Sequence, residues 1–152
     1  MFVTTQFSIF MVNKSGVLAQ VLGEFAREKI NIMAMTMMDS AEQGVMRIVF
    51  DSPKKAQEVL SRLNMPHSAT DVLCLFLDNK SGALAAVAEK LAKSHINISY
   101  AYVTAGAKGG KTTGILKVAD VKKAMRVLEK DQGIKKVGKS QPLVRRPKAS
   151  AF

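Results

Sequence analysis

The sequence contains one six-residue pattern twice: Asn13–Leu18 (Asn-Lys-Ser-Gly-Val-Leu) returns 66 residues later as Asn79–Leu84 (Asn-Lys-Ser-Gly-Ala-Leu). The same register holds further along, because Ile30–Ile32 (Ile-Asn-Ile) returns as Ile96–Ile98. Hydrophobic pattern alone explains matching valines, but no core requires matching asparagines and glycines. We therefore predict that the chain of 152 residues folds as one small module in duplicate.

The repeat divides the chain into two modules and a tail. We expect module one at residues 1–70, module two at residues 71–138, and a basic, flexible tail at residues 139–152. A unit of about 70 residues buries too small a share of its surface to be more than marginally stable alone. We therefore expect the modules to pack on each other and the chain to form a homo-oligomer, with a dimer as the default.

The formal net charge of +11 invites a nucleic-acid-binding interpretation, but the charge is concentrated near the C-terminus. Over residues 1–131 acidic and basic residues are interspersed. No acidic residue follows Asp131, whereas six cations do: Lys135, Lys136, Lys139, Arg145, Arg146 and Lys148. The basicity thus belongs mostly to the tail, whose composition is typical of a disordered terminus.

Composition argues against a membrane protein and favours the cytoplasm. Hydrophobic residues make up 47% of the chain, but no apolar run approaches the roughly 18 residues of a spanning helix. The first residues alternate instead of forming a basic region followed by an apolar segment, so we expect no signal peptide. Cys74 is the single cysteine, which excludes an intrachain disulfide and fits a reducing compartment.

The hydrophobic pattern of module one predicts the order strand, helix, strand, strand, helix. Residues 5–12 alternate as a strand does, and the apolar spacing from Val17 to Lys29 is helical. Ser52 and Pro53 have the composition of a helix start. The remaining predicted segments are strands at 32–38 and 45–50, a polar hairpin loop between them at 39–44, and a helix from Pro53 through Leu63.

Module two repeats this plan. Residues 70–77 are suited to be the last strand of module one, the first strand of module two, or both in one extended segment. A short strand near residues 134–137 would complete the unit. The other predicted elements are a helix at 83–93, a strand at 98–103, a loop through Gly110, a strand at 112–118 and a helix at 120–130.

Each module therefore has the predicted order βαββαβ. This is the ferredoxin-like plan of the α+β class, in which two helices cover one face of an antiparallel sheet. We predict two such modules in tandem. Because this fold hosts many unrelated functions, the fold by itself assigns none of them.

The repeated loop, followed by the helix and the Ile-Asn-Ile stretch, resembles the ACT domain family over about residues 5–137. The usual loop of that family runs Asp or Asn, any residue, Pro, Gly, any residue, Leu. Here Ser15 and Ser81 stand where proline is commonest. The resemblance implies an allosteric regulatory module of amino-acid metabolism that binds a small ligand.

The resemblance also implies ligand-binding residues. In the serine-sensing regulatory domains of phosphoglycerate dehydrogenase, one Asn opens this loop and another begins the second strand. Those enzymes carry a histidine two residues before the loop Asn, where this chain has Met11 and Leu77, which argues against serine as the ligand. The ligand-binding residues implied here are Asn13, Lys14, Ser15, Gly16, Val17, Leu18 and Asn31, and Asn79, Lys80, Ser81, Gly82, Ala83, Leu84 and Asn97.

The chemistry of this loop supports a site independently of the resemblance. A glycine just before a helix lets the backbone turn sharply, and the helix N-terminus offers unpaired N–H groups and a positive dipole end to a carboxylate. An Asn amide can accept from an ammonium group and donate to a carboxylate. The alternative is that the Asn and Ser side chains act as ordinary helix caps and bind no ligand.

Other signals favour neither catalysis nor metal binding. The stretch Ala105–Thr113 ends in Gly-Lys-Thr like a phosphate-binding loop, but a strand pattern follows where that motif needs a helix. His67 and His95 have no clustered Cys or carboxylate residues nearby, so we expect no metal site. Cys74 lies in an apolar strand pattern and is expected to be inert. We predict a non-enzyme without a cofactor.

The two modules differ at their second strands. Methionines form a soft apolar strand in module one, suited to a core, a partner surface or a bulky ligand. Tyr100 and Tyr102 hold roughly corresponding positions in module two. The two sites therefore need not be equivalent. The methionines are Met33, Met35, Met37 and Met38.

Three functions follow from these observations. The leading hypothesis is a non-catalytic sensor that binds an amino acid or related small carboxylate at module interfaces and regulates a partner enzyme. The second is a nucleic-acid-binding module that uses its sheet and basic tail, although only Tyr100 and Tyr102 alternate as stacking aromatics do. The third is a structural oligomerisation module with empty loops.

Overall fold

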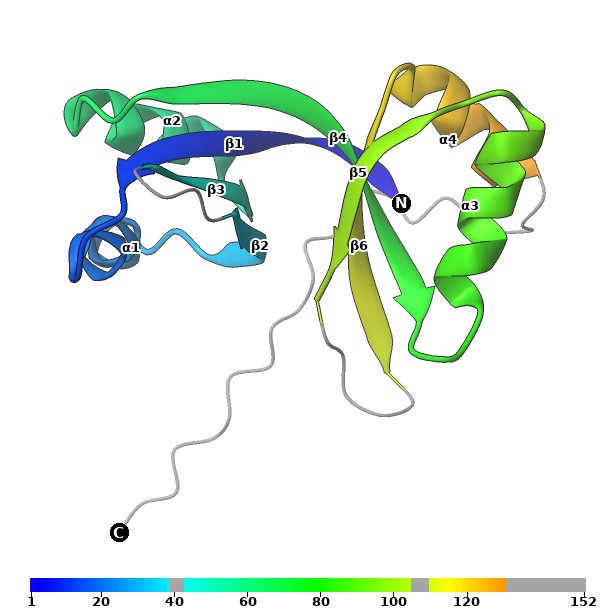
Figure 1. Cartoon of the computed structure of the whole chain (residues 1–152), viewed down its shortest axis with the longest axis horizontal. Helices are drawn as coiled ribbons and strands as arrows, with labels where there is room; N and C mark the ends of the chain where they lie inside the picture. The colour runs from blue at the N-terminus through cyan, green and yellow to red at the C-terminus, as the bar shows by residue number, and fades with distance from the viewer. Residues whose placement is uncertain (39–42, 105–109, 131–152) are drawn as a thin grey trace, which may run out of the picture.

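The computed structural model describes residues 1–38, 43–104 and 110–130 (Figure 1). The predicted strand at 134–137, the basic tail and most of both long hairpin loops lie outside the described residues. No helix in the described ranges is both long and apolar enough to span a membrane. The elements are β1 (Phe2–Val12), α1 (Val17–Arg27), β2 (Ile32–Met38), β3 (Gln43–Phe50), α2 (Pro53–Arg62), β4 (His67–Asp78), α3 (Ala83–Lys93), β5 (Ile98–Val103), β6 (Lys111–Val118) and α4 (Val121–Lys130).

The six strands form one antiparallel sheet in the order β2-β3-β1-β4-β6-β5. β4 serves both halves: Ser68 in its first part pairs with Ser8 of β1, and Leu73 further along pairs with Leu116 of β6. The predicted α+β class and the two ferredoxin-like units are therefore confirmed. The two predicted sheets are joined into one, because the segment predicted at 70–77 is a single extended strand.

The register of β1 against β4 places a pseudo-two-fold axis at the centre of this sheet. Thr5 pairs with Asp71, its own counterpart 66 residues later in the repeat. The pair of Phe7 with Ala69 likewise has its counterpart in the pair of Leu73 with Val3. The duplicated sequence thus becomes a symmetric structure, in which the loops after β1 and β4 lie at opposite ends of the sheet (Figure 1).

β1 is longer than the alternating pattern indicated. The pattern predicted a strand from residue 5, but β1 begins at Phe2, which pairs with Cys74 of β4. The first residues of β1 lie beside β4 on the side away from β6. Backbone pairing with a distant strand satisfies their N–H and C=O groups, so tertiary structure extends the strand beyond its local signal.

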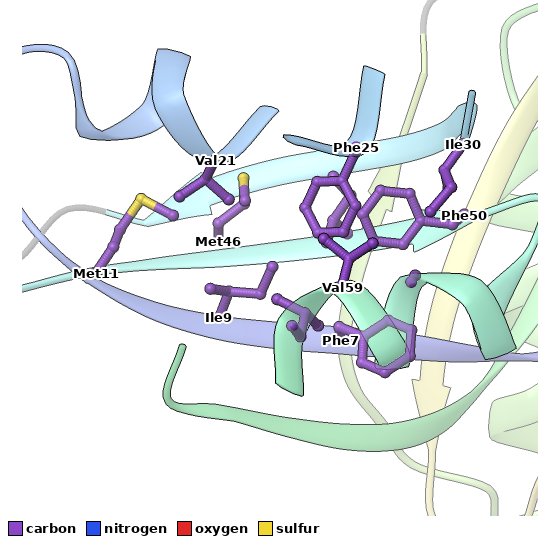
Figure 2. Packing of buried hydrophobic residues seen from close by; sticks show 12 residues of the cluster. Phe7, Ile9, Met11, Val21, Phe25, Ile30, Met46, Phe50 and Val59 are labelled. Carbon is purple, nitrogen blue, oxygen red and sulfur yellow. The ribbon is translucent and has the colours of Figure 1, made fainter. Parts of the chain in front are cut away.

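The helices cover one face of each half of the sheet. In the first half, α1 and α2 pack on side chains from β1 and β3, as Figure 2 shows for Phe7, Ile9 and Met46. The ring centroids of Phe25 in α1 and Phe50 in β3 lie 4.4 Å apart. In the second half, α3 and α4 form an equivalent core with β4 and β6. These cores fix where α1 and α3 begin.

The two halves also meet on the sheet face that carries no helix. A third cluster there joins β2 and β3 of the first half to β4 and β6 of the second; its buried members are Ala34, Val49, Val72, Cys74 and Ile115. Because each half contributes side chains, this cluster stabilises one arrangement of the two modules.

A buried polar cluster lies on the same helix-free face. The fully buried Gln6 of β1 donates from Nε2 to the Tyr100 hydroxyl at 2.7 Å and accepts from the Tyr102 hydroxyl at 3.0 Å. The guanidinium carbon of Arg47 in β3 lies 3.9 Å from the centroid of the Tyr100 ring. Strands of the first half are thereby tied to β5 of the second half.

Candidate functional site

The loop between β1 and α1 is a tight turn built around Gly16. The backbone N–H of Val17 donates to the Lys14 carbonyl at 3.3 Å, and Gly16 has φ 88° and ψ −17°. This bond and the positive φ at the third position are the marks of a type II turn, which requires glycine or asparagine there. Ser15 occupies the second position, where proline is common.

The loop between β4 and α3 repeats this geometry. The N–H of Ala83 donates to the Lys80 carbonyl at 3.4 Å, and Gly82 has φ 84° and ψ −8°. The predicted sharp turn before each helix is therefore confirmed at both copies. We call the segments Asn13–Leu18 and Asn79–Leu84, with the strand ends before them, corner one and corner two.

A glycine holds the N-cap position at both corners. Gly16 and Gly82 are the N-cap residues of α1 and α3, and neither helix has a side-chain cap hydrogen bond. The Asn and Ser residues of the repeat therefore do not occupy the N-cap positions of these helices. The first-turn N–H groups carry the positive end of the helix dipole.

The structure separates the two asparagines of the module-one set. Asn13 follows the end of β1, level with Gln43 at the start of β3. Asn31 precedes β2, where its N–H donates to the Asp51 carboxylate and its carbonyl accepts from the Asp51 N–H, past the end of β3. The eight residues from Gln43 to Phe50 span about 23 Å at the usual strand rise. Within one module these two side chains therefore lie at opposite ends of the sheet.

Corner one opens onto an apolar groove of about 470 Å³. Phe10 and Val12 of β1 are exposed by 39% and 57% at its edge. The N–H of Phe10 donates to the Pro66 carbonyl at 2.9 Å, which joins the strand to the loop after α2. The lining residues are Phe10, Met11, Val12, Val17, Gln43, Met65 and Pro66.

At corner two, charged side chains stand beside the loop, whereas the side chains beside corner one are mostly apolar. Asp78 stands where corner one has Val12, and its carboxylate pairs with Lys111 and, at 3.7 Å, with Lys80. The hydrogen bond and charge of Lys111 lower the pKa of Asp78 below its ordinary value, with Lys80 adding to the effect. The two corners thus share a backbone but differ in chemistry, as the unlike second strands had suggested.

The signals that argued for other chemistry have structural explanations. Nδ1 of His67 lies 2.7 Å from the Met65 carbonyl and Nε2 lies 2.8 Å from the Gln57 amide, so this ring is held by local bonds. The described ranges contain no group of three metal-ligating side chains. β6 begins at Lys111, so a strand follows the Gly-Lys-Thr sequence, as predicted. Burial raises the pKa of the Cys74 thiol to about 11.

Sequence reasoning missed most of the groove. Gln43, Met65 and Pro66 reach it from segments far from the repeated loop, and no local pattern marks them. One signal was present: Val12 and Asp78 occupy the same position of the repeat with different chemistry. The buried cluster around Gln6 had no sequence signal, because its members lie more than 90 residues apart.

Comparison with known proteins places this geometry in a family. The sequence matches the family model described as an ACT domain pair over residues 1–137. The structure resembles protein BT0572 from Bacteroides thetaiotaomicron with 31% identity and a TM-score of 0.78, covering 84% of this chain and 88% of that one. No curated protein matches the sequence.

Two aspartate kinase structures share the fold at lower identity. The ligand-free regulatory subunit from Thermus thermophilus is 14% identical with a TM-score of 0.62, covering 86% of this chain and 97% of that one. A structure of aspartokinase alpha and beta subunits is 20% identical with a TM-score of 0.55, covering 86% and 96%. The repeated corners, the fused sheet and the family match lead to one conclusion: the chain belongs to the family of ACT domain pairs.

Proposed function

We propose that this protein is a non-catalytic sensor that binds an amino acid or related small carboxylate at ACT module interfaces and regulates a partner enzyme of amino-acid metabolism. The observation that carries the proposal is the pair of corners, where α1 and α3 each begin at a positive-φ glycine. The first-turn N–H groups of a helix and its positive dipole end suit a carboxylate. The fold shared with an aspartate kinase regulatory subunit supports a regulatory role.

We infer that a second copy of the chain completes the site at corner one. Asn13 and Asn31 lie too far apart within one module to contact one small ligand. If β2 pairs antiparallel with β2 of a second copy, Ile32 of that copy lies near Met38 of the first. Asn31 of the second copy then stands at the same end of the sheet as Asn13, so each dimer forms two equivalent sites.

The edge of β2 is suited to such pairing. β2 ends the sheet, so one row of its backbone N–H and C=O groups faces away from β3. Its sequence, Ile-Met-Ala-Met-Thr-Met-Met, contains none of the charges or prolines with which natural proteins protect an edge. Four of its side chains are at least 37% exposed: Ile32, Met35, Met37 and Met38. Such a strand favours association with a second copy.

Calorimetry across the twenty amino acids and related small carboxylates tests ligand binding. We expect one chemical class to bind, and Asn13→Ala to weaken that binding about tenfold, as the loss of a hydrogen bond to a charged group does. Glu58→Ala, at an exposed position within α2, is the control and should bind normally. If no compound binds and none raises the melting temperature, the proposal is wrong.

Mixed dimers test the composite site. Every chain in this experiment carries Asn79→Ala, so that ligand binding is measured at corner one. Dimers made only of Asn13→Ala chains, or only of Asn31→Ala chains, should bind the ligand weakly. A mixed dimer contains one site with both asparagines intact and one site with neither. Refolding the two chains together should therefore restore tight binding in up to one site per mixed dimer. Weak binding by every mixed dimer would show that both asparagines act within one chain or not at all.

The nucleic-acid alternative loses the two tyrosines that could have stacked on bases. The hydroxyls of Tyr100 and Tyr102 bond to Gln6, and one face of the Tyr100 ring is covered by Arg47. These were the aromatic residues available for stacking on bases. We also place the sensor in the cytoplasm, which the single, buried cysteine supports.

A further inference from the structure

The groove beside corner one has a chemical character that corner two lacks. Six of its seven lining residues are apolar, and the seventh, Gln43, is an uncharged amide. The first residue of α1, Val17, forms part of the wall, so the groove and the start of the helix are contiguous. Its volume of about 470 Å³ lies within the roughly 300–1,000 Å³ of small-molecule sites.

We propose that corner one selects an amino acid with a large apolar side chain, branched or aromatic, and places that side chain in the groove. The inference rests on the proposed function, because it names the ligand class of the same site. The carboxylate lies at the start of α1, where the dipole and Lys14 provide positive charge, and the side chain replaces water on the apolar walls. The groove is thus positively charged at the start of α1 and apolar beyond it, which matches a ligand with a carboxylate at one end and an apolar side chain at the other.

The repeat supplies an internal comparison. At the position of Val12, corner two carries Asp78, paired with Lys80 and Lys111. A charged side chain at that position costs free energy when an apolar group covers it. Corner two therefore does not take the same ligand, and the protein binds the apolar amino acid at corner one only.

The size of the preference follows from burial. Covering a side chain as large as leucine or phenylalanine changes affinity by about tenfold or more relative to a small polar side chain. Val12 contributes because it is 57% exposed at the groove edge and becomes covered when the ligand enters. Val3, at the other end of β1, is 39% exposed but lies outside the groove.

Titration calorimetry on the full chain tests this selection, with leucine, isoleucine, phenylalanine and methionine compared with serine, threonine, aspartate and lysine. At least one apolar amino acid should bind about tenfold or more tightly than every polar one. Val12→Asp, which copies the residue of corner two, should weaken that binding about tenfold or more, and Val3→Asp should leave it unchanged. Circular dichroism spectra of both variants check that they remain folded.

Each other outcome identifies what has failed. If a polar amino acid binds best and Asn13→Ala abolishes its binding, the sensor function stands and the apolar selection is wrong. If no amino acid binds but a related small carboxylate does, the sensor function stands and the apolar selection is wrong; if neither binds, both proposals fail. If Val12→Asp leaves ligand affinity unchanged but alters the sedimentation of the protein, the groove is an interface between copies, and the selection is likewise overturned.

Discussion

Gly16 and Gly82 hold a backbone conformation that other residues adopt only at a cost. Both have φ near +85°, in the left-handed region. A Cβ added at Gly16 would meet no atom within 4 Å, so the cost of a side chain there is conformational and not steric. The backbone conformation of the turn is thus by itself enough to require the repeated glycine.

A pair of alanine substitutions separates these effects. Gly16→Ala should lower the free energy of unfolding by about 1 kcal/mol, because alanine disfavours a positive φ. Gly23→Ala, inside α1 with no atom within 4 Å of the new Cβ, should raise it by about 0.5–1 kcal/mol. Urea unfolding monitored by circular dichroism measures both. Similar effects of the two substitutions would contradict the assigned conformation of Gly16.

Cys74 illustrates how a tertiary position changes the chemistry of one residue. Its side chain is fully buried between β1 and β6, and burial raises the pKa of its thiol to about 11. The folded protein therefore prefers the protonated thiol over the thiolate. This preference stabilises the fold fully below the pKa of the unfolded thiol and is lost as the pH rises through about 11.

The wild-type protein should accordingly lose about 2 kcal/mol of unfolding free energy to this thiol between pH 8 and pH 11. Lysines and tyrosines titrate in the same pH range, so the pH dependence of urea unfolding is compared between the wild type and Cys74→Ala. The difference between the two proteins gives the contribution of the thiol. The thiol should also resist alkylation at pH 8 until the protein unfolds. Rapid labelling of the native protein would show that Cys74 is accessible.

At the scale of elements, the two edge strands of the sheet differ. β2 is charge-free with exposed methionines, while β5 directs Tyr100 and Tyr102 into the cluster with Gln6. The methionine strand was predicted as core or interface filler, and the structure leaves three of its four methionines exposed. One edge is therefore open for association and the other edge strand is tied to the first module.

A single charge on β2 should prevent dimerisation. Met35→Lys places an ammonium group at the middle of the edge, where antiparallel pairing would bring it opposite the same residue of a second copy. Sedimentation velocity should show monomer for this variant and dimer for the wild type. Ala101→Lys, exposed on β5, is the matched control and should remain dimeric. Dimers of Met35→Lys would place the interface elsewhere.

At the scale of the whole molecule, the cluster around Gln6 determines how the modules face each other. Burial of an amide is costly unless it is hydrogen-bonded, and both polar atoms of this amide are paired with tyrosine hydroxyls from β5. Burial also raises the pKa of Tyr102, so its hydroxyl remains a donor throughout the neutral range. The cluster therefore favours one relative orientation of the modules over others.

Double-mutant analysis tests this role. Tyr102→Phe should lower the free energy of unfolding by about 1–2 kcal/mol, because it leaves the buried Gln6 carbonyl without its donor. Gln6→Leu should also be destabilising, but the double variant should be less destabilised than the sum of the two, since no unpaired carbonyl remains. Urea unfolding provides the three values. Additive effects would show that the hydrogen bond contributes nothing.

Local patterns predicted most of the fold. The apolar spacing of α1, the proline at the start of α2 and the glycine turns specify structure through contacts within a few residues, so the sequence shows them directly. The first residues of β1 were missed because their strand conformation depends on β4. At the candidate site, the corners were predicted, whereas the groove walls Met65 and Pro66 were not, because they come from another segment of the chain.

The sequence by itself determined the duplication, the module plan and the position of each corner, since these depend on turn chemistry and helical periodicity. Only the tertiary structure decided that β4 serves both halves, that Asn13 and Asn31 lie at opposite ends of a module, and that Gln6 joins β1 to β5. These features arise from pairing and packing between segments distant in sequence. Such contacts leave no periodic signal in the chain, so they become visible only when it is folded.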